Sequence, residues 1–138
     1  EWKNATGWMT GKSICIWSGI TCDEKGFVTN ANLRVNRLLG SIPAEISLLN
    51  RLTGLDLLDN SLTGTLPTEM GLLRNLIQLQ LRSNYIGGSI PTEIGQLTML
   101  QNLVLGYNQV NGTIPANIGS CTGLRQLDFS YNNMNGAI

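Results

Sequence analysis

Few side chains of this sequence have types and spacing suited to catalysis, because none of its 138 residues is histidine. Without histidine the chain lacks the commonest general base and metal ligand, and a Ser-His or Cys-His pair is excluded. Asp56 and Asp128 could serve as an acid and a base, and they lie three 24-residue periods apart. At about 4.8 Å per strand the two carboxyl groups are roughly 14 Å apart, beyond the roughly 5–9.5 Å of glycoside hydrolysis. We therefore predict that the chain is not an enzyme and holds no metal or cofactor.

The charge composition limits the classes of partner that the chain can bind. The sequence has nine Lys and Arg residues and nine Asp and Glu residues, so its formal net charge is zero. A nucleic-acid-binding domain needs a basic surface, and so does a protein that binds an anionic membrane. No apolar run approaches the roughly 18 residues that span a bilayer. We expect neither a nucleic acid nor a membrane to contact this segment.

The segments that would position these side chains form a sequence repeat. Seven-residue phrases begin at Gly40 (GSIPAEI), Gly64 (GTLPTEM), Gly88 (GSIPTEI) and Gly112 (GTIPANI), 24 residues apart, and contain all four prolines. The frame LxxLxLxxNxL accompanies them in five copies, of which the first is degenerate. Such a period predicts stacked coils that share one core. LxL predicts a short strand with its leucines buried, and the asparagine suits a tight corner, where its amide satisfies unpaired backbone groups.

The extended frame LxxLxLxxNxLxGxIPxxIGxLxx is similar to the plant-type leucine-rich repeat of receptor-like kinases, receptor-like proteins and polygalacturonase-inhibiting proteins. The resemblance covers residues 28–138. It implies an α/β-type solenoid, a right-handed leucine-rich repeat superhelix with a parallel concave β-sheet and short strands or 3-10 turns on the other faces. In that family the GxIP segment forms a second, smaller sheet on one flank. The implied domains are an N-terminal cap at 1–27 and repeats at 28–51, 52–75, 76–99, 100–123 and, incomplete, 124–138. Cys121 stands in a leucine column, so we expect it in the core.

The stretch from Trp8 through Cys15 and Trp17 to Cys22 resembles the N-terminal cap of that family, W…CxWxGxxC. The amphipathic helix that usually precedes the first tryptophan is missing or reduced here. The resemblance implies a Cys15–Cys22 disulfide, which would contribute about 2–3 kcal/mol and indicate an extracellular or cell-surface location. Two reduced cysteines in a cytosolic cap are the alternative. Trp8 and Trp17 can cover the core at this end.

Two further features concern modification and the other end of the sequence. Asn4 and Asn111 lie in Asn-x-Thr sequons, which predict N-glycosylation in a secreted protein. Asn111 is the better candidate because its position falls on the flank, away from the LxL strands. The sequence stops within the fifth repeat, so we expect further repeats or another subunit to cover that end.

Recognition is expected on the outward positions of the LxL strands. Tyrosine and arginine are frequent binding hot spots, and all three tyrosines stand at or just past these positions. The alternative is that tyrosine beside the corner asparagine is ordinary filler in this family. The predicted ligand-binding residues on the concave face are Arg34, Asp56, Gln80, Arg82, Tyr85, Tyr107, Asp128 and Tyr131.

These features favour an extracellular module that recognises a protein, peptide or glycan on its concave face, within a longer receptor-like or inhibitor-like chain. Five short strands offer a strip of about 300 Å², against about 800 Å² per partner in a standard interface, so we expect this segment alone to bind weakly. Two alternatives stay open. One is a scaffold subunit of a larger assembly. The other is an ice-binding solenoid that orders water on a hydroxyl column formed by Ser41, Thr65, Ser89 and Thr113.

Overall fold

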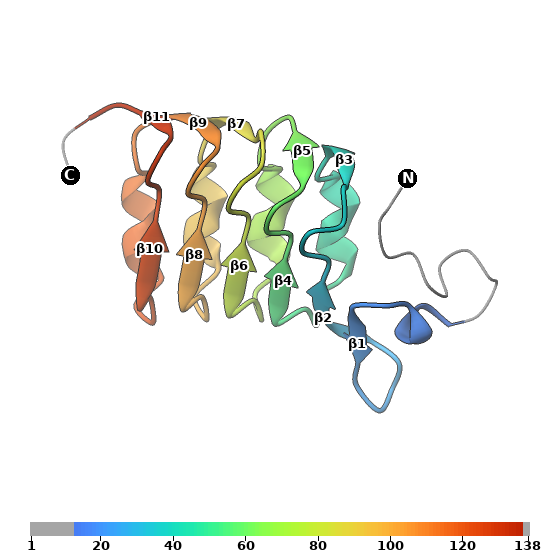
Figure 1. Cartoon of the computed structure of the whole chain (residues 1–138). Helices are drawn as coiled ribbons and strands as arrows, with labels where there is room; N and C mark the ends of the chain where they lie inside the picture. The colour runs from blue at the N-terminus through green and yellow to red at the C-terminus, as the bar shows by residue number, and fades with distance from the viewer. Residues whose placement is uncertain (1–12, 137–138) are drawn as a thin grey trace.

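The computed structural model describes residues 13–136, which form a solenoid of stacked coils (Figure 1). Along the chain a strand of a large sheet, a short lateral strand and a 3-10 helix follow one another repeatedly. Figure 1 shows the large sheet on one side of the solenoid and the helices on the opposite side. We number the coils 1 to 5 by their large-sheet strands, β2 (Val28–Asn32), β4 (Gly54–Asp56), β6 (Gln78–Gln80), β8 (Asn102–Val104) and β10 (Gln126–Asp128). The predicted solenoid is confirmed.

The large sheet carries the face on which recognition was predicted. Its strand order is β1-β2-β4-β6-β8-β10. β1 (Ile20–Cys22) pairs antiparallel with β2, and the other strands pair in parallel. Leu55 pairs with Leu79, and Leu103 with Leu127, so equivalent repeat positions lie side by side in columns. We call the outward surface of this sheet the sheet face; it corresponds to the concave face predicted from the sequence.

The lateral strands form two small sheets. One contains β3 (Leu39–Ser41) and β5 (Ser61–Thr63), and the other contains β7 (Gly87–Ser89), β9 (Gln109–Gly112) and β11 (Asn133–Met134). Between them lie a bridge that joins Thr65 to Gly87 and two backbone hydrogen bonds, from the Tyr85 N–H to the Leu62 carbonyl and from the Gly87 N–H to the Gly64 carbonyl (both 2.8 Å). The flank therefore carries small parallel sheets where the family resemblance implied one.

Short 3-10 helices form the side of the solenoid opposite the large sheet. They are η2 (Ala44–Leu48), η3 (Thr68–Leu72), η4 (Thr92–Gln96) and η5 (Ala116–Ser120), and each begins directly after the proline of the GxIP phrase. Proline suits this position because its fixed φ leads into the helix and it has no N–H to leave unpaired. Within residues 13–136 no helix combines the length and apolarity needed to cross a bilayer.

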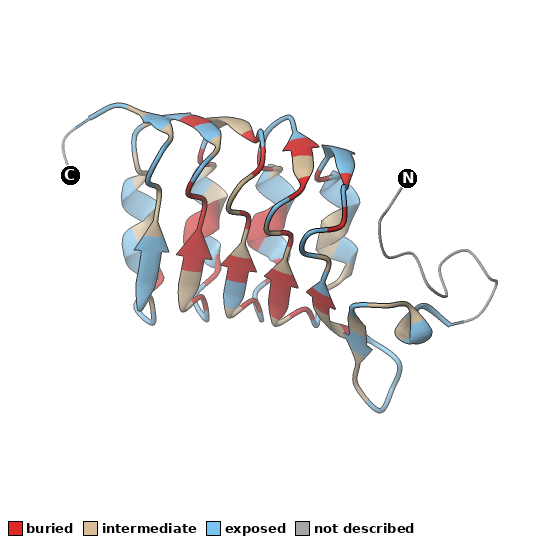
Figure 2. Cartoon of the chain, viewed as in Figure 1, coloured by how far each residue is buried: buried red, intermediate tan, exposed pale blue. Residues whose placement is uncertain are grey.

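The leucine columns form one continuous core. Leu79, Leu81, Leu103 and Leu105 are completely buried in coils 3 and 4. Figure 2 shows the burial concentrated in the inner coils and reduced in β10, where Leu127 is 45% exposed. Cys121 is buried in its leucine column, as predicted, and burial raises the pKa of its thiol. This cysteine is a core residue.

The corner asparagines do what the repeat predicted. The Asn84 side chain accepts a hydrogen bond from the Leu62 N–H (3.0 Å) and donates to the Leu57 and Leu81 carbonyls (3.0 and 3.1 Å). Equivalent bonds recur at three further corners. The residue before each corner asparagine has a positive φ of 53–57°, which the sequence reasoning missed. Tyr107 and Tyr131 occupy this left-handed position, so the corner sets their direction.

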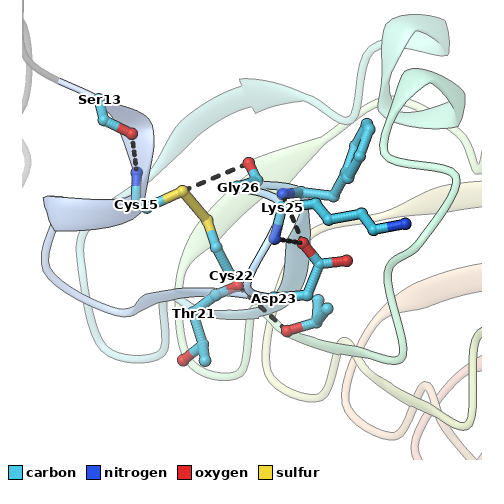
Figure 3. The surroundings of a disulfide bond; sticks show 9 residues. Ser13, Cys15, Thr21, Cys22, Asp23, Lys25 and Gly26 are labelled. Carbon is cyan, nitrogen blue, oxygen red and sulfur yellow. Dashed lines mark hydrogen bonds between the residues drawn. A yellow bond between two sulfur atoms is a disulfide. The ribbon is translucent and has the colours of Figure 1, made fainter.

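The cap is a hairpin tied by a disulfide. Cys15 in η1 (Ile14–Ile16) and Cys22 in β1 are bonded, which confirms the predicted pair (Figure 3). The Asp23 carboxylate then holds the turn into β2, because its Oδ1 accepts hydrogen bonds from the N–H groups of Lys25 (2.9 Å) and Phe27 (3.0 Å). Asn4 and Trp8 lie outside the described residues, so their predicted roles stay predictions.

Candidate functional site

An ion pair crosses the sheet face from coil 3 to coil 5. Arg82 follows β6, and its Nη1 lies 3.0 Å from Oδ2 of Asp128 at the end of β10. The pair thus spans coil 4, which lies between the two strands in the sheet. The other Asp128 oxygen accepts hydrogen bonds from the Ser130 N–H (2.9 Å) and hydroxyl (2.6 Å). The hydrogen bond from the Ser130 hydroxyl lowers the pKa of Asp128 below its ordinary value most strongly. The bond from the Ser130 N–H and the charge of Arg82 lower this pKa further.

Coil 4 makes room for this bridge. A Cβ on Gly106 would lie 2.8 Å from Asp128 Oδ2, so the carboxylate occupies the space that a side chain would need. Val104 stands in an outward column, yet it is only 3% exposed. Its Cα partners in the sheet are Gln80 and Asp128, whose longer side chains flank it on both sides. Val104 occupies the same repeat position as Asp56, Gln80 and Asp128, which was predicted to point outward, so its burial corrects that prediction for coil 4.

A stack of planar groups runs beside the ion pair. The Arg82 guanidinium carbon lies 4.5 Å from the centroid of the Tyr107 ring. The Tyr107 and Tyr131 rings stack with their centroids 4.1 Å apart. A hydrogen bond with Tyr131, followed by desolvation, raises the pKa of Tyr107 above its ordinary value. Both rings remain accessible, at 41% and 71% exposure. We call Arg82, Tyr107, Asp128 and Tyr131 the face cluster.

The other four predicted face residues do not join this cluster. Asp56 uses its Oδ1 locally, accepting a hydrogen bond from the Leu58 N–H (3.1 Å). Gln80 is half-buried in β6, and Arg34 is exposed in coil 1. Tyr85 lies past its corner asparagine, where its N–H donates to the Leu62 carbonyl (2.8 Å), and among residues 13–136 its ring does not stack on the other two tyrosines. The structure therefore brings together four of the eight predicted face residues, all in coils 3 to 5, and the binding role of all eight stays a prediction.

Asn111, the predicted glycosylation site, is exposed in β9 of the lateral sheet. It lies away from the face cluster, which belongs to the large sheet. Its predicted modification stays a prediction.

Sequence reasoning missed a second cluster, at the cap, in which an arginine likewise pairs with an aspartate and lies over an aromatic ring. Arg51 Nη1 lies 3.1 Å from Oδ2 of Asp23, and its guanidinium carbon lies 4.5 Å from the centroid of the Phe27 ring. This cap cluster borders a shallow pocket of about 570 Å³ that is also lined by Thr29, Asn50, Thr53, Asn75, Ile77 and Met99. The Asp23-Glu-Lys-Gly26 turn was a usable signal for the hairpin. The repeat pattern gave no indication that Asp23 of this turn would pair with Arg51.

The side chains of the sheet face suit non-covalent contacts. Over the described part of the chain, His, Cys, Asp and Glu side chains form no group of three or more that could hold a metal ion. The face cluster provides a guanidinium, two phenol hydroxyls and exposed ring surface, held by contacts among residues of three coils. Such an arrangement suits recognition of another molecule.

Comparisons with known proteins agree with this fold. The family described as Leucine Rich Repeat matches residues 75–97 and 99–121. The crystal structure of the BIR2 ectodomain from Arabidopsis thaliana is 30% identical with a TM-score of 0.91, covering 97% of this chain and 74% of that one. A receptor kinase ectodomain from the same plant, GASSHO1/SCHENGEN3 in complex with CASPARIAN STRIP INTEGRITY FACTOR 2, is 30% identical with a TM-score of 0.76, covering 87% of this chain and 18% of that one.

One similar structure has a different described activity. A plant ice-binding protein is 26% identical with a TM-score of 0.76, covering 95% of this chain and 51% of that one. A search of curated proteins found no significant match. The repeat frame, the disulfide cap and the likeness to receptor ectodomains agree with one another. This chain belongs to the plant-type leucine-rich repeat family and has the fold of plant receptor-kinase ectodomains.

Proposed function

We propose that this chain is an extracellular recognition module that binds a protein or peptide on the sheet face, with the face cluster as the centre of contact. The proposal keeps the predicted division into a cap at 1–27 and repeats of 24 residues from residue 28. The single observation that carries it is the face cluster, in which side chains of three coils converge on one exposed surface.

The face cluster is suited to binding because its side chains are already ordered. Asp128 and the Tyr107 ring restrict the Arg82 guanidinium, so little side-chain entropy remains to be lost when a ligand contacts it. Tyrosine and arginine are also the residues over-represented among interface hot spots. An ordered and exposed surface of this composition favours recognition over ordinary filler at the tyrosine positions.

Other observations support the class of ligand and the location. The GASSHO1/SCHENGEN3 ectodomain, which shares this fold, is described in a complex with a partner factor. The Cys15–Cys22 disulfide is of the kind that persists in oxidising compartments. A glycan on Asn111 would leave the sheet face free, because β9 belongs to the lateral sheet. A receptor and an inhibitor would use this face alike, and only the identity of the partner distinguishes them.

The test is capture of a partner from extracellular extract on the immobilised chain. We compare the wild type with a Tyr107→Ala, Tyr131→Ala double variant, and use Tyr85→Ala as the matched control because that tyrosine lies outside the face cluster. Equal folding is checked by circular dichroism. A partner lost only by the double variant supports the proposal. A partner kept by all three places recognition elsewhere, and no partner at all favours a scaffold.

A second candidate function is ice binding, favoured by the likeness to the plant ice-binding protein. The hydroxyl column lies against the glycines of the following coils, since a Cβ on Gly88 would lie 2.7 Å from Cγ2 of Thr65. The Cα partner of Ser41 is Thr63 and that of Ser89 is Asn111, so the residues of the hydroxyl column are not paired with one another in the small sheets, and we rank the function second. Thermal hysteresis that disappears in a Thr65→Leu, Thr113→Leu variant would support it, and an inactive wild type would exclude it.

A further inference from the structure

The N-terminal end of the sheet face contains a cleft that the face cluster does not use. It has a volume of about 330 Å³ and lies between the cap and coil 1. The lining residues are Ser18 and Gly19 of the cap together with Asn32, Leu33, Arg34 and Asn36 of coil 1.

The two walls of this cleft are fixed to each other. β1 pairs with β2 through Ile20 and Ala31, and the Asn32 N–H donates to the Gly19 carbonyl (2.7 Å). Gly19 has a φ of 83°, and a Cβ there would collide with the Asn32 carbonyl oxygen. Only glycine therefore fits this wall, and the cleft is a built part of the junction between the cap and the repeats.

The charge that lines this cleft is positive. Arg34 is exposed, and no residue within 13–136 forms an ion pair with it. Arg51 and Arg82, by contrast, each pair with an aspartate and lie over a ring. No carboxylate lines the cleft. Asp56 is the Cα partner of Asn32 on the coil 2 side, so an incoming anion is favoured on the cap side of Arg34.

We propose that this cleft binds a carboxylate group of a peptide ligand. A guanidinium holds a carboxylate through paired N–H donors, and the Asn32 amide and Ser18 hydroxyl supply further donors on the same walls. The inference rests on the proposed binding of a peptide to the sheet face. It adds an orientation for the bound peptide, with an acidic group at the cap and uncharged or aromatic groups toward the face cluster.

The spacing constrains such a ligand. Three strand steps separate coil 1 from coil 4, or about 14 Å at roughly 4.8 Å per step. An extended peptide covers this distance with about four residues. We expect a ligand whose acidic group precedes or follows the group on Tyr107 by about that number of residues.

The experiment is an amide-shift NMR titration of the purified chain with short synthetic peptides. The probes are acetyl-DSGSY-amide, its NSGSY counterpart and acetyl-YSGSN with a free C-terminal carboxylate, so that each acid lies about four residues from the tyrosine and a side-chain acid is compared with a terminal acid. Trigalacturonate serves as the saccharide probe. We expect an acidic peptide to shift the amides of Ser18, Gly19 and Asn32 to Arg34 in a saturable way, and the neutral peptide to leave them nearly unchanged.

Two matched variants separate a built site from general charge attraction. Arg34→Gln should raise the dissociation constant of the acidic peptide about tenfold, as expected for loss of a charged hydrogen-bonded pair. Arg37→Gln removes the same charge from the same coil, but Arg37 lies at the corner beside Asp59, outside the cleft. We expect Arg37→Gln to change the dissociation constant less than twofold.

Several results would overturn the inference. These are equal affinity for acidic and neutral peptides, equal effects of the two variants, no shift with any peptide, or cleft shifts with trigalacturonate alone. Shifts at Arg82 and Tyr107 without shifts in the cleft would overturn this inference while supporting the proposed function. Cleft binding that Tyr107→Ala leaves unchanged, together with a captured partner that does not need Tyr107 and Tyr131, would overturn the proposed function alone.

Discussion

Two clusters of the same chemistry lie at different places in this solenoid. In each an aspartate and an arginine form an ion pair, at 3.1 Å in the cap cluster and 3.0 Å in the face cluster. In each the guanidinium lies 4.5 Å from the centroid of an aromatic ring. The difference is in what they connect. Asp23 holds the hairpin turn of the cap, whereas the face cluster spans three coils of the open sheet.

The comparison shows that the same three side-chain types can serve folding or recognition, depending on the backbone beneath them. The ring of the cap cluster is Phe27, which offers no hydrogen bond, and the pair ties an irregular hairpin to coil 1. The face cluster uses tyrosines with hydroxyl groups and stands on a regular sheet that needs no further tie. We therefore expect changes in the cap cluster to affect stability and changes in the face cluster to affect binding.

The largest expected effect comes from breaking the cap. A Cys15→Ser, Cys22→Ser variant should lose about 2–3 kcal/mol of unfolding free energy, because the short disulfide loop no longer restricts the unfolded chain. Urea unfolding measures the loss. The tyrosine signal in near-UV circular dichroism should stay native before unfolding, since the face cluster does not depend on the cap.

Reductant provides the control for the disulfide prediction. It should bring the wild type to the stability of the double variant and leave the variant unchanged, because the only remaining thiol is that of the buried Cys121. An unaltered urea midpoint in the variant would contradict the assigned role of the cap disulfide.

The next prediction breaks the face cluster and spares the fold. Gly106→Ala places a Cβ 2.8 Å from Asp128 Oδ2, so the carboxylate must move away from Arg82. Because Gly106 has no positive φ, alanine is unstrained there, and we expect stability to change by less than about 1 kcal/mol. Near-UV circular dichroism of the tyrosine pair should change, and capture of the partner should weaken.

Gly123→Ala is the matched control for this substitution. A Cβ on Gly123 would lie 3.6 Å from its nearest neighbour, the Leu100 carbonyl oxygen, which is an ordinary contact. An unchanged tyrosine signal in Gly106→Ala would show that the ion pair between Arg82 and Asp128 does not need the space left by a glycine at position 106.

Much of the fold could be predicted because it follows from a period. Equivalent positions 24 residues apart fall into columns, and the columns alone are enough to assign Arg82, Tyr107, Asp128 and Tyr131 to one face. The same register predicted the buried Cys121. The corner asparagines were predictable for a chemical reason, since their amide both donates and accepts where the backbone leaves both kinds of group unpaired.

The features that escaped prediction do not follow from the period. The ion pair depends on the reach of the Arg82 side chain across coil 4 and on the empty space at Gly106. Neither can be read from the alignment of repeat positions. Val104 is buried because of its two neighbours, not because of its own column. The cap cluster joins an irregular hairpin to the loop after η2, where there is no repeat from which to extrapolate.

The third prediction separates the clusters through their arginines. Arg82→Gln should weaken capture of the partner about fivefold or more, because it removes a charged donor and the cation over Tyr107. Arg51→Gln should leave capture unchanged and lower the midpoint of thermal unfolding slightly, and added salt should diminish that difference. Binding measurements and thermal scans on both variants test the pair together. The reverse pattern would show that the cap cluster recognises the partner.

The smallest expected effect is the dependence of the face cluster on pH. Hydrogen bonds from Ser130 and the charge of Arg82 lower the pKa of Asp128 below its ordinary value of 3.8. A group whose pKa is lowered by folding contributes stability above its unfolded pKa and loses it as the pH falls through the folded value. The tyrosine signal in near-UV circular dichroism should therefore be constant from pH 7 to about pH 4 and change only in stronger acid.

Acid alone cannot distinguish the two clusters, because the hydrogen bond from the Phe27 N–H likewise lowers the pKa of Asp23. Asp128→Asn makes the distinction. This variant lacks the titrating group of the face cluster, so its tyrosine signal should be altered at pH 7 and should not respond further to acid before global unfolding. In this variant acid should still remove the stability that Asp23 contributes to the cap, by the same amount as in the wild type. Thermal unfolding measures this loss. A tyrosine transition near pH 5–6 in the wild type would mean that Asp128 is not held ionised by its partners, and the face cluster would then not be ordered in the way that recognition requires.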